Sequence, residues 1–326
     1  MTEPSVPAVS GPKTPAHHRP SLREIRRSAI GYWAAFGLAC LVFQAVVFAR
    51  WIIGGDFHAH SSGGYTIPQT MKIATHIGQA TVALLLLVLA AGLWRECRSQ
   101  NRITLNTAVF IGFCFSFWSN PYVSQFHYAA GNNRYDLNVD TWGPYLPGWR
   151  GDTPAVESFL MEAGYPAMLM WIVIALAVAR GLVRRRPHWS PRRTLAATTL
   201  VMLVCEPVMT SGYQRLGGFA YPRALPGNLT FFEGHWYQLP LTSTLAVVGF
   251  FIMPVLAMAL YAGDDREVHL FRGCERFPRR LRPWVRLTAG VGFMNACTLG
   301  FQLTMALASL ISHPVDLPSW WDRPAD

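Results

Sequence analysis

The chain has 326 residues, of which 51% are apolar or aromatic and 14% are charged, and its mean hydropathy is +0.22. A soluble domain of this size usually carries about 25% charged residues. The composition therefore predicts a polytopic membrane protein and argues against a soluble Rossmann or barrel enzyme. Six Cys residues are too few for a disulfide scaffold, and the meaning of the formal net charge of +10 depends on where the basic residues lie.

Seven apolar runs approach the length of about 20 residues that a helix needs to cross the hydrocarbon core of a bilayer. They cover residues 29–53, 70–94, 104–119, 158–183, 194–212, 239–262 and 285–311. The third run is short and ends in a polar motif. The expected fold is an all-α polytopic membrane protein, a seven-transmembrane-helix bundle with long ordered outer loops.

This reading divides the chain into three parts. Residues 1–28 are expected to form a disordered cytoplasmic tail, because they are polar and rich in proline. Residues 29–312 form the seven-helix membrane domain, and residues 313–326 form an outer C-terminal tail.

The distribution of basic residues predicts the orientation in the membrane. Of the 28 Lys and Arg residues, 21 lie before the first run, in the loops that follow the second, fourth and sixth runs, or in the ends of the runs next to these loops. Because cytoplasmic loops carry the excess of Lys and Arg, we expect a multi-pass protein of the cell membrane with its N-terminus in the cytoplasm and its C-terminus outside. The basic charge then indicates topology and contact with anionic lipids, and no nucleic acid partner is expected.

Polar chemistry is concentrated in the three outer loops, residues 54–69, 120–157 and 213–238. Loops this long are usually functional or disordered, and the many Trp, Tyr, Gly and Pro residues here favour order. Most of the aromatic residues are expected to form the interfacial belt. The remainder could line an apolar substrate pocket, where ring faces would stabilise a developing cation.

Two acidic residues fall inside the apolar runs. Glu206 lies in the fifth run and Glu162 lies early in the fourth. Burying a carboxylate in a bilayer costs about 3 kcal/mol or more, so Glu206 is either a functional acid or a structural one paired with His76 or Arg215. An acid that stays protonated in such surroundings would serve as a general acid.

Further polar residues in the runs share helix faces with one another. His76 and Gln79 are three residues apart in the second run, and Asn295 and Gln302 are seven apart in the last. Residues at these spacings lie on one face of a helix. We expect these faces and the acids to converge on one polar cavity that opens outward.

The sequence offers little support for a metal or for other common chemistries. His58, His60, His127 and His235 could meet in space, but no HxxxH, HExxH or CxxC element is present, so the signal for a metal site is weak. The chain also has no GxSxG element, Walker loop or dinucleotide fingerprint. No metal and no cofactor are therefore expected.

Three motifs carry a resemblance to a known family. Residues 118–122 read Trp-Ser-Asn-Pro-Tyr and lead through Tyr128, Asn132 and Asn133 to residues 142–149, Trp-Gly-Pro-Tyr-Leu-Pro-Gly-Trp. Residues 231–240 read Phe-Phe-Glu-Gly-His-Trp-Tyr-Gln-Leu-Pro. In order, spacing and hydropathy over residues 33–308, the chain resembles the AveC-like spirocyclase family of actinobacterial membrane proteins.

The resemblance implies a cofactor-independent cyclisation of a polyketide dihydroxy-ketone to a spiroketal, in some cases with a dehydration, in antibiotic biosynthesis. The sequence departs from the family pattern at Asn120, where Asp is more usual, and at Thr141, where Ser is usual. If that Asp is an essential acid elsewhere, this chain either uses Asp136, Glu206 or Glu233 instead or performs different chemistry.

These arguments give a set of candidate site residues and partners. The catalytic candidates are Glu206, Glu233, Asp136 and Glu162. The substrate-binding candidates are Trp118, Asn120, His127, Tyr128, Asn132, Asn133, Trp142, Trp149, Tyr213, His235, Tyr237, Gln238 and His76. The expected partners are a lipophilic small-molecule substrate and membrane lipids.

Two other functions fit the same sequence. A membrane terpene cyclase would use buried acids and aromatic residues to protonate a prenyl chain. A non-enzymatic small-molecule transporter would be expected to show internal repeats or symmetrically broken helices, and none is evident in the sequence.

Overall fold

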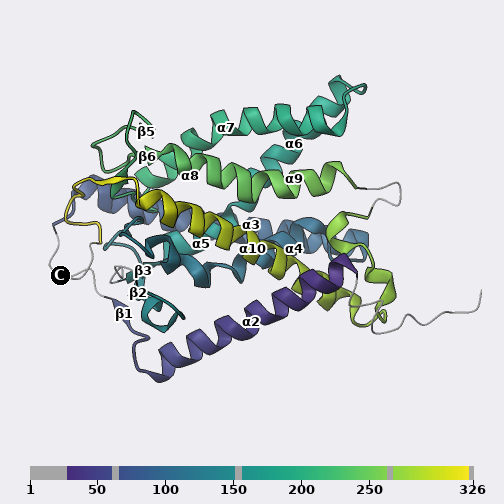
Figure 1. Ribbon diagram of the computed structural model, residues 1–326, viewed down its shortest axis with the longest axis horizontal. Coiled ribbons are helices and arrows are strands. Elements are labelled where there is room, and N and C mark those ends of the chain that lie inside the picture. Colours follow the sequence, from purple (N-terminus) through teal and green to yellow (C-terminus); the bar gives the residue numbers. More distant parts are fainter. Residues whose placement is uncertain (1–27, 61–65, 151–155, 263–266, 323–326) are drawn as a thin grey trace, which may run out of the picture.

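The described chain is mostly helical, and its helices form one bundle. The computed structural model describes residues 28–60, 66–150, 156–262 and 267–322. Within these ranges, six helical segments are long and apolar enough to cross a membrane: α2 (Ala29–Ile53), α3 (Gln69–Gln100), α5 and α6 (Phe159–Ala167 and Leu169–Arg185), α7 (Pro191–Arg215), α8 to α9 (Leu241–Ala246 and Met253–Leu260), and α10 (Arg282–Ser309). Figure 1 shows them side by side, with the labelled strands gathered at one end of the bundle.

The third predicted span is not a spanning helix. Helix α4 covers only Leu105–Cys114, and after two residues the chain continues as the 3-10 helix η1 (Phe117–Ser124). Ten residues of α-helix reach about 15 Å, roughly half the thickness of the hydrocarbon core. The prediction of seven spanning helices is therefore not confirmed. The predicted span included Ser116 and Ser119 because they continue the apolar run. In the structure these residues lie in the buried turn that ends α4, where their hydroxyls donate to backbone carbonyl groups.

Two other spans contain irregular turns. Pro166 lies in the last turn of α5, and α6 begins at Leu169. A π-helical turn, Val247–Ile252, separates α8 from α9. Such turns often occur at functional sites, and both lie in helices that border the hollows described below.

Helices α2 and α10 approach each other at the level of their backbones. A Cβ atom on Gly37 would lie 1.9 Å from the Thr288 carbonyl oxygen, and one on Gly292 would lie 2.1 Å from the Trp33 carbonyl oxygen. Small residues allow this kind of close packing between helices in membranes. The bulk of α10 is buried, and it forms the centre of the hydrophobic core.

The loop end of the bundle is built from short antiparallel strands. Strands β1 (Ala59–His60), β2 (Asn138–Asp140) and β3 (Val156–Ser158) form one sheet in that order. Strands β4 (Arg223–Ala224) and β7 (His313–Pro314) form a pair, as do β5 (Thr230–Phe231) and β6 (Leu239–Pro240). These pairs join loops that are far apart in the sequence.

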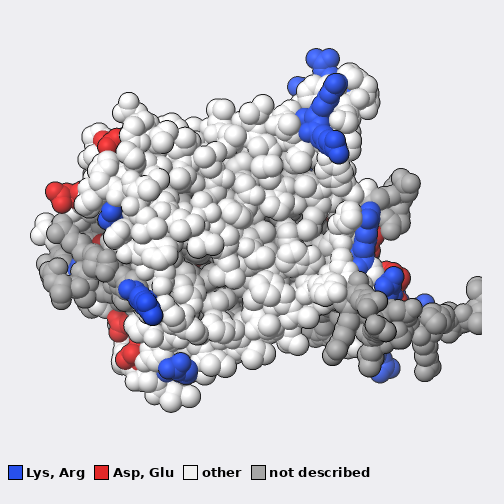
Figure 2. All heavy atoms as spheres, in the orientation of Figure 1, with Lys and Arg blue, Asp and Glu red and all other residues white. Residues whose placement is uncertain are grey.

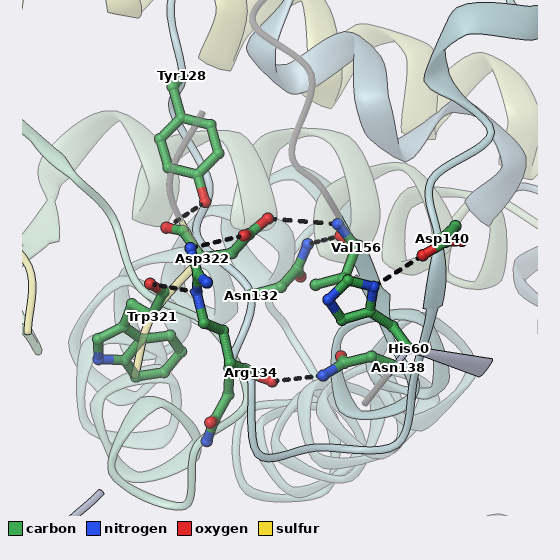
Figure 3. Close-up of polar contacts among 10 residues, drawn as sticks. His60, Tyr128, Asn132, Arg134, Asn138, Asp140, Val156, Trp321 and Asp322 are labelled. Atoms are coloured by element: carbon green, nitrogen blue, oxygen red, sulfur yellow. Dashed lines mark hydrogen bonds and ion pairs between the residues drawn. The ribbon is translucent and has the colours of Figure 1, made fainter. Parts of the chain in front are cut away.

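The described part of the expected C-terminal tail is packed into this loop layer. Trp321 and Asp322 are almost fully buried. In Figure 3 the Tyr128 hydroxyl donates to the Asp322 carbonyl oxygen (2.8 Å), and the Arg134 guanidinium lies 3.5 Å from the Asp322 carboxylate. The segment is thus an integral layer of the fold as far as residue 322. Residues 323–326 and the expected disordered tail, residues 1–27, lie outside the described residues.

Charge and exposure agree with a membrane environment. Figure 2 shows Lys, Arg, Asp and Glu side chains at the two ends of the visible face, with a broad uncharged belt between them. Large apolar side chains are exposed along the long helices, including Leu87, Val204 and Val208. A soluble surface of this size would carry charges throughout, so the belt and the six apolar helices are typical of a membrane protein.

The contact between α2 and α10 provides a test of the fold. Gly292→Ala should lower the free energy of unfolding by about 1–3 kcal/mol, because the new methyl group forces two backbones apart. Gly92→Ala is the matched control, since a Cβ atom at Gly92 meets nothing within 4 Å. Thermal unfolding of the purified protein in detergent measures both variants, and equal melting temperatures would contradict the packing.

Candidate functional site

A cavity of about 1020 Å³ lies at the strand end of the bundle, bordered by α2, α3, α5 and the loop that carries β2. One wall is aromatic and includes Phe48, Trp51, Phe117 and Trp142. The Trp142 ring packs edge-on against the rings of Phe48 and Trp51, with centroid distances of 5.4 and 5.6 Å. The cavity is therefore mostly apolar and large enough for a drug-sized molecule.

Two acidic side chains lie together in this cavity because a strand turns directly into a helix. Glu157 is in β3, and Ser158 caps α5 by accepting a hydrogen bond from the Met161 amide. Glu162 then falls in the first turn of α5. Both glutamates line the cavity.

Glu157 is held by two hydrogen bonds in an otherwise water-excluded position. The Thr141 hydroxyl donates to one carboxylate oxygen (2.7 Å), and the Asn120 amide donates to the other (3.0 Å). Burial raises the pKa of Glu157 to about 7, and the two hydrogen bonds act in the opposite direction. A carboxyl that titrates near neutrality is suited to proton transfer.

Glu162 differs from Glu157 in its surroundings. Its two oxygens are shielded from solvent, and the polar groups that interact with it are the carboxyl of Glu157 and the amide of Asn120. The two carboxyls of the cavity are thus unequal, which is the arrangement that separates an acid role from a base role.

A chain of hydrogen bonds leads from Glu157 into the bundle. The Tyr165 hydroxyl donates to the Asn120 side-chain oxygen (2.9 Å) and accepts from the Gln302 amide (2.6 Å). Asn120 and Tyr165 also line a smaller hollow of about 40 Å³. The amide of Asn120 therefore connects the large cavity to the interior.

Asp136 lines the same cavity, but its acceptor sites are occupied. Its carboxylate accepts hydrogen bonds from the Ser158 hydroxyl (2.6 Å), the Leu160 amide (2.7 Å), the Leu137 amide (2.8 Å) and the Gln79 side chain. These bonds join α3, the β2 loop and the start of α5. Both carboxylate oxygens of Asp136 are thus occupied by bonds that hold these three elements together.

Glu206 and Glu233 lie elsewhere, so the expectation of one cavity shared by Glu206, Glu162 and Glu233 is wrong. Glu206 is buried in α7, where it accepts a hydrogen bond from the Thr210 hydroxyl one turn later (2.6 Å). Glu233 is partly exposed in the turn between β5 and β6, 3.1 Å from His313. The sequence placed all three toward one end of the helices, but packing turned their side chains in different directions.

Among the described residues, Glu206 also does not form the structural pair with His76 or Arg215 that was the alternative to a functional role. His76 faces the Gln79 side chain (3.4 Å), as their shared helix face predicts. The Arg215 guanidinium stacks over the Tyr237 ring at 4.5 Å. Neither forms an ion pair with Glu206 in the part of the chain that the structure describes.

Several of the expected substrate-binding residues make hydrogen bonds that hold loops in place. The Trp118 indole donates to the Asn295 side chain (2.7 Å), and the Asn133 amide donates to the Thr75 hydroxyl (2.8 Å). The Asn132 amide donates to the Val156 carbonyl oxygen (2.6 Å), which Figure 3 shows beside the Asp322 contact. Tyr128 makes the contact with Asp322 given above.

The other expected residues divide between the two hollows and the loop surface. His76 and Trp142 line the large cavity, whereas Asn120 and Tyr213 line the small one. Gln238 is buried and donates to the Tyr221 carbonyl oxygen (2.8 Å). The remaining candidates lie in the loops: His127 and Trp149 are partly buried, and His235 stacks on Tyr237 with a centroid distance of 5.1 Å.

The residues that sequence reasoning missed are Glu157, Thr141 and Tyr165. Glu157 lies just before an apolar run and therefore counted only as one of many polar loop residues. The available signal was Ser158, a residue type that favours helix N-caps. A helix that begins after Ser158 places Glu157 at its entrance, five residues before Glu162.

The histidines do not form a metal cluster in this structure. Within the described ranges, no group of three or more His, Cys, Asp or Glu side chains is arranged to hold a metal ion. His60 instead pairs with Asp140 across β1 and β2 at 2.8 Å, as Figure 3 shows.

The hydrogen bond from Thr141 yields a prediction about Glu157. Thr141→Val should raise the pKa of Glu157 above about 7, because it removes a donor that favours the charged form. Infrared titration of the carboxyl band, assigned with Glu157→Gln, measures this pKa. Thr199→Val, which removes a hydroxyl that has no partner among the described residues, should leave the titration unchanged; a similar shift in both variants would contradict the assignment.

Comparison with known proteins agrees with the motifs. No curated protein and no solved structure matches the chain. The family model described as "Spirocyclase AveC-like" matches residues 100–324, which begins later and ends later than the range of 33–308 expected from the sequence. The match covers the three motifs, most of the loop layer, and the Glu157, Glu162 and Asn120 positions. The chain therefore belongs to the AveC-like spirocyclase family.

Proposed function

We propose that this protein is a membrane-embedded cyclase that forms a spiroketal from a polyketide dihydroxy-ketone in the cavity between α2, α3 and α5. The observation that supports this most directly is the pair of unequal carboxyls, Glu157 and Glu162, in one large apolar cavity. Acid–base catalysis of this kind requires no redox or nucleotide cofactor.

The reaction needs proton transfers that two carboxyls can supply. One hydroxyl of the substrate adds to the ketone to give a hemiketal, and the second displaces the hemiketal hydroxyl, so that the products are one spiroketal and one water. In this scheme Glu162, which lies next to the Glu157 carboxyl, donates a proton to the carbonyl or to the departing hydroxyl. Glu157, whose charged form is stabilised by Thr141 and Asn120, accepts the proton of the attacking hydroxyl, and the cavity walls hold hydroxyl and carbonyl in attack geometry, which lowers the entropic barrier.

Asn120 links the proposal to the family pattern. Where the family more often has Asp, this chain has an amide that donates to Glu157 and accepts from Tyr165. An Asp at this position would add a third carboxyl next to Glu157. With Asn120 the proton chemistry falls to Glu157 and Glu162, and Thr141 supplies the hydroxyl that the usual Ser would supply.

The position of the cavity suits a substrate that dissolves in the bilayer. Its walls come from α2 and α3, which are both candidate spans, and from aromatic side chains. An amphiphilic polyketide made in the cytoplasm would partition into the membrane and reach the cavity from there. The strand end would then face outward, in keeping with the distribution of Lys and Arg.

The proposed orientation predicts the outcome of reporter fusions. Alkaline phosphatase fused after residue 226, in the loop between β4 and β5, should be active, because that loop lies outside. The same enzyme fused after residue 188, between α6 and α7, should be inactive. The reverse pattern would show that the proposed orientation in the membrane is wrong.

Catalysis by the two carboxyls predicts the effect of removing them. Glu157→Gln and Glu162→Gln should each lower kcat by about 10²–10⁴-fold, the usual contribution of a positioned acid or base. Activity of the unsubstituted protein should rise as the pH rises through about 7, because Glu157 must lose its proton before it can accept one, and the residual activity of Glu157→Gln should lack this limb. Glu275→Gln, an exposed residue at the opposite end of the bundle, is the control. Full activity of either cavity variant would show that the substituted carboxyl is not catalytic.

The substrate class is tested with the purified protein in detergent. A dihydroxy-ketone polyketide should give a product that has lost one water, with the spiroketal carbon identified by NMR. Conversion of a prenyl epoxide instead would identify a terpene cyclase. An acyclic precursor that accumulates in a deletion strain would identify the native substrate.

A further inference from the structure

One cationic side chain in the cavity has no carboxylate partner. Lys72, in the first turns of α3, is half-buried and lines the cavity. Its ammonium lies 5.0 Å from the centroid of the Tyr135 ring. Among the described residues it forms no ion pair.

The two aspartates at this end of the bundle that lie in or beside β2 are already engaged. Asp136 accepts four hydrogen bonds from α3, α5 and the β2 loop. Asp140 pairs with His60 at 2.8 Å and lies 3.8 Å from His58. The positive charge of Lys72 is therefore left for a ligand.

The helix that carries Lys72 adds to the positive potential. The first turn of α3 contains no acidic residue, and its N-cap, Pro68, supplies no side-chain hydrogen bond. The N-terminal end of a helix attracts negative charge, and an acidic residue is the usual complement there. His76 lies one turn after Lys72 and lines the same cavity.

Lys72 and the aromatic wall together favour an amphiphilic ligand, with one negatively charged group and one apolar part. The wall of Trp51 and Trp142 offers apolar contact along the cavity, and Glu157 and Glu162 lie on its α5 side. We propose that the substrate is a long-chain carboxylate whose carboxylate group pairs with Lys72 while its apolar chain lies along this wall. The inference rests on the proposed function and narrows it to an open-chain acid, in which the oxygenated carbons reach the two glutamates.

A carboxylate fits the available donors better than a phosphate does. The cavity offers one ammonium and imidazole groups but no guanidinium among its lining residues. Phosphate sites commonly use the paired donors of Arg. A single negative charge matches a single Lys.

Binding of a brominated fatty acid tests the proposal on the full-length protein. Bromine quenches tryptophan fluorescence at short range, and Trp51 and Trp142 line the cavity. In neutral detergent at pH 8, dibrominated stearic acid should bind about 10-fold more tightly than its methyl ester. Lys72→Met should bind both with the weaker affinity of the ester, and Lys72→Arg should retain the preference.

The control removes a cation of the same end of the bundle. Arg50 in α2 stacks over the Tyr145 ring at 5.9 Å and is not among the residues that line the cavity. Arg50→Met should keep the preference for the acid. An equal loss in both variants would show a general surface charge effect and overturn the proposal.

Two further arms separate the possible outcomes. In nanodiscs, if phosphatidylglycerol competes with the fatty acid and phosphatidylcholine does not, Lys72 binds a lipid headgroup and the proposal is wrong. Glu157→Gln should retain the preference for the acid, because Glu157 acts in the reaction and does not bind the carboxylate of the fatty acid. If Glu157→Gln loses turnover and still prefers the acid over the ester, both proposals are supported. If the wild-type protein turns over the dihydroxy-ketone but does not prefer the acid, only the proposal of a carboxylate substrate is overturned.

Discussion

The hydrogen bonds that converge on Asp136 fix the geometry on which the site depends. A buried carboxylate must have its acceptor sites satisfied, and Asp136 meets this need with donors from Gln79, Ser158 and the backbone of α5. These contacts hold the end of β3 and the start of α5 against α3. Because Glu157 and Glu162 flank this junction, the clamp places both carboxyls in one cavity.

The cavity combines apolar walls with poised acids, and each feature supports the other. Aromatic packing excludes water around Glu157, and this burial is what raises its pKa toward neutrality. Thr141 and Asn120 limit the rise by donating to the charged form. The result is a carboxyl that exchanges its proton near neutral pH in mostly apolar surroundings.

The long loops at the strand end of the bundle serve mainly as a scaffold. The loop that contains Asn132 and Asn133 is bonded to β3, to α3 and to the C-terminal segment. These contacts explain why the Asn132 and Asn133 amides are buried without lining the cavity. The loops close the strand end of the bundle and hold β2 and β3 where the acids are needed.

The sequence by itself determined the membrane class, five of the seven predicted spans to within a few residues, and the family. Apolar length and the positions of Lys and Arg are local properties, so they can be counted along the chain. The sequence also found the shared faces of His76 with Gln79 and of Asn295 with Gln302, because helical spacing fixes them. The sequence wrongly predicted a spanning helix over residues 104–119, because their apolar composition does not reveal that the helix ends at Cys114.

The tertiary structure alone decided which acids meet. Glu206 and Glu162 look alike in sequence, as single acids within apolar runs, yet only Glu162 lines the large cavity. Glu157 was one polar loop residue among many until the pairing of β2 with β3 brought Thr141 to it and the fold brought Asn120. Long-range contacts of this kind depend on how helices rotate and pack against one another, and that information is not carried by the spacing of residues within any one segment.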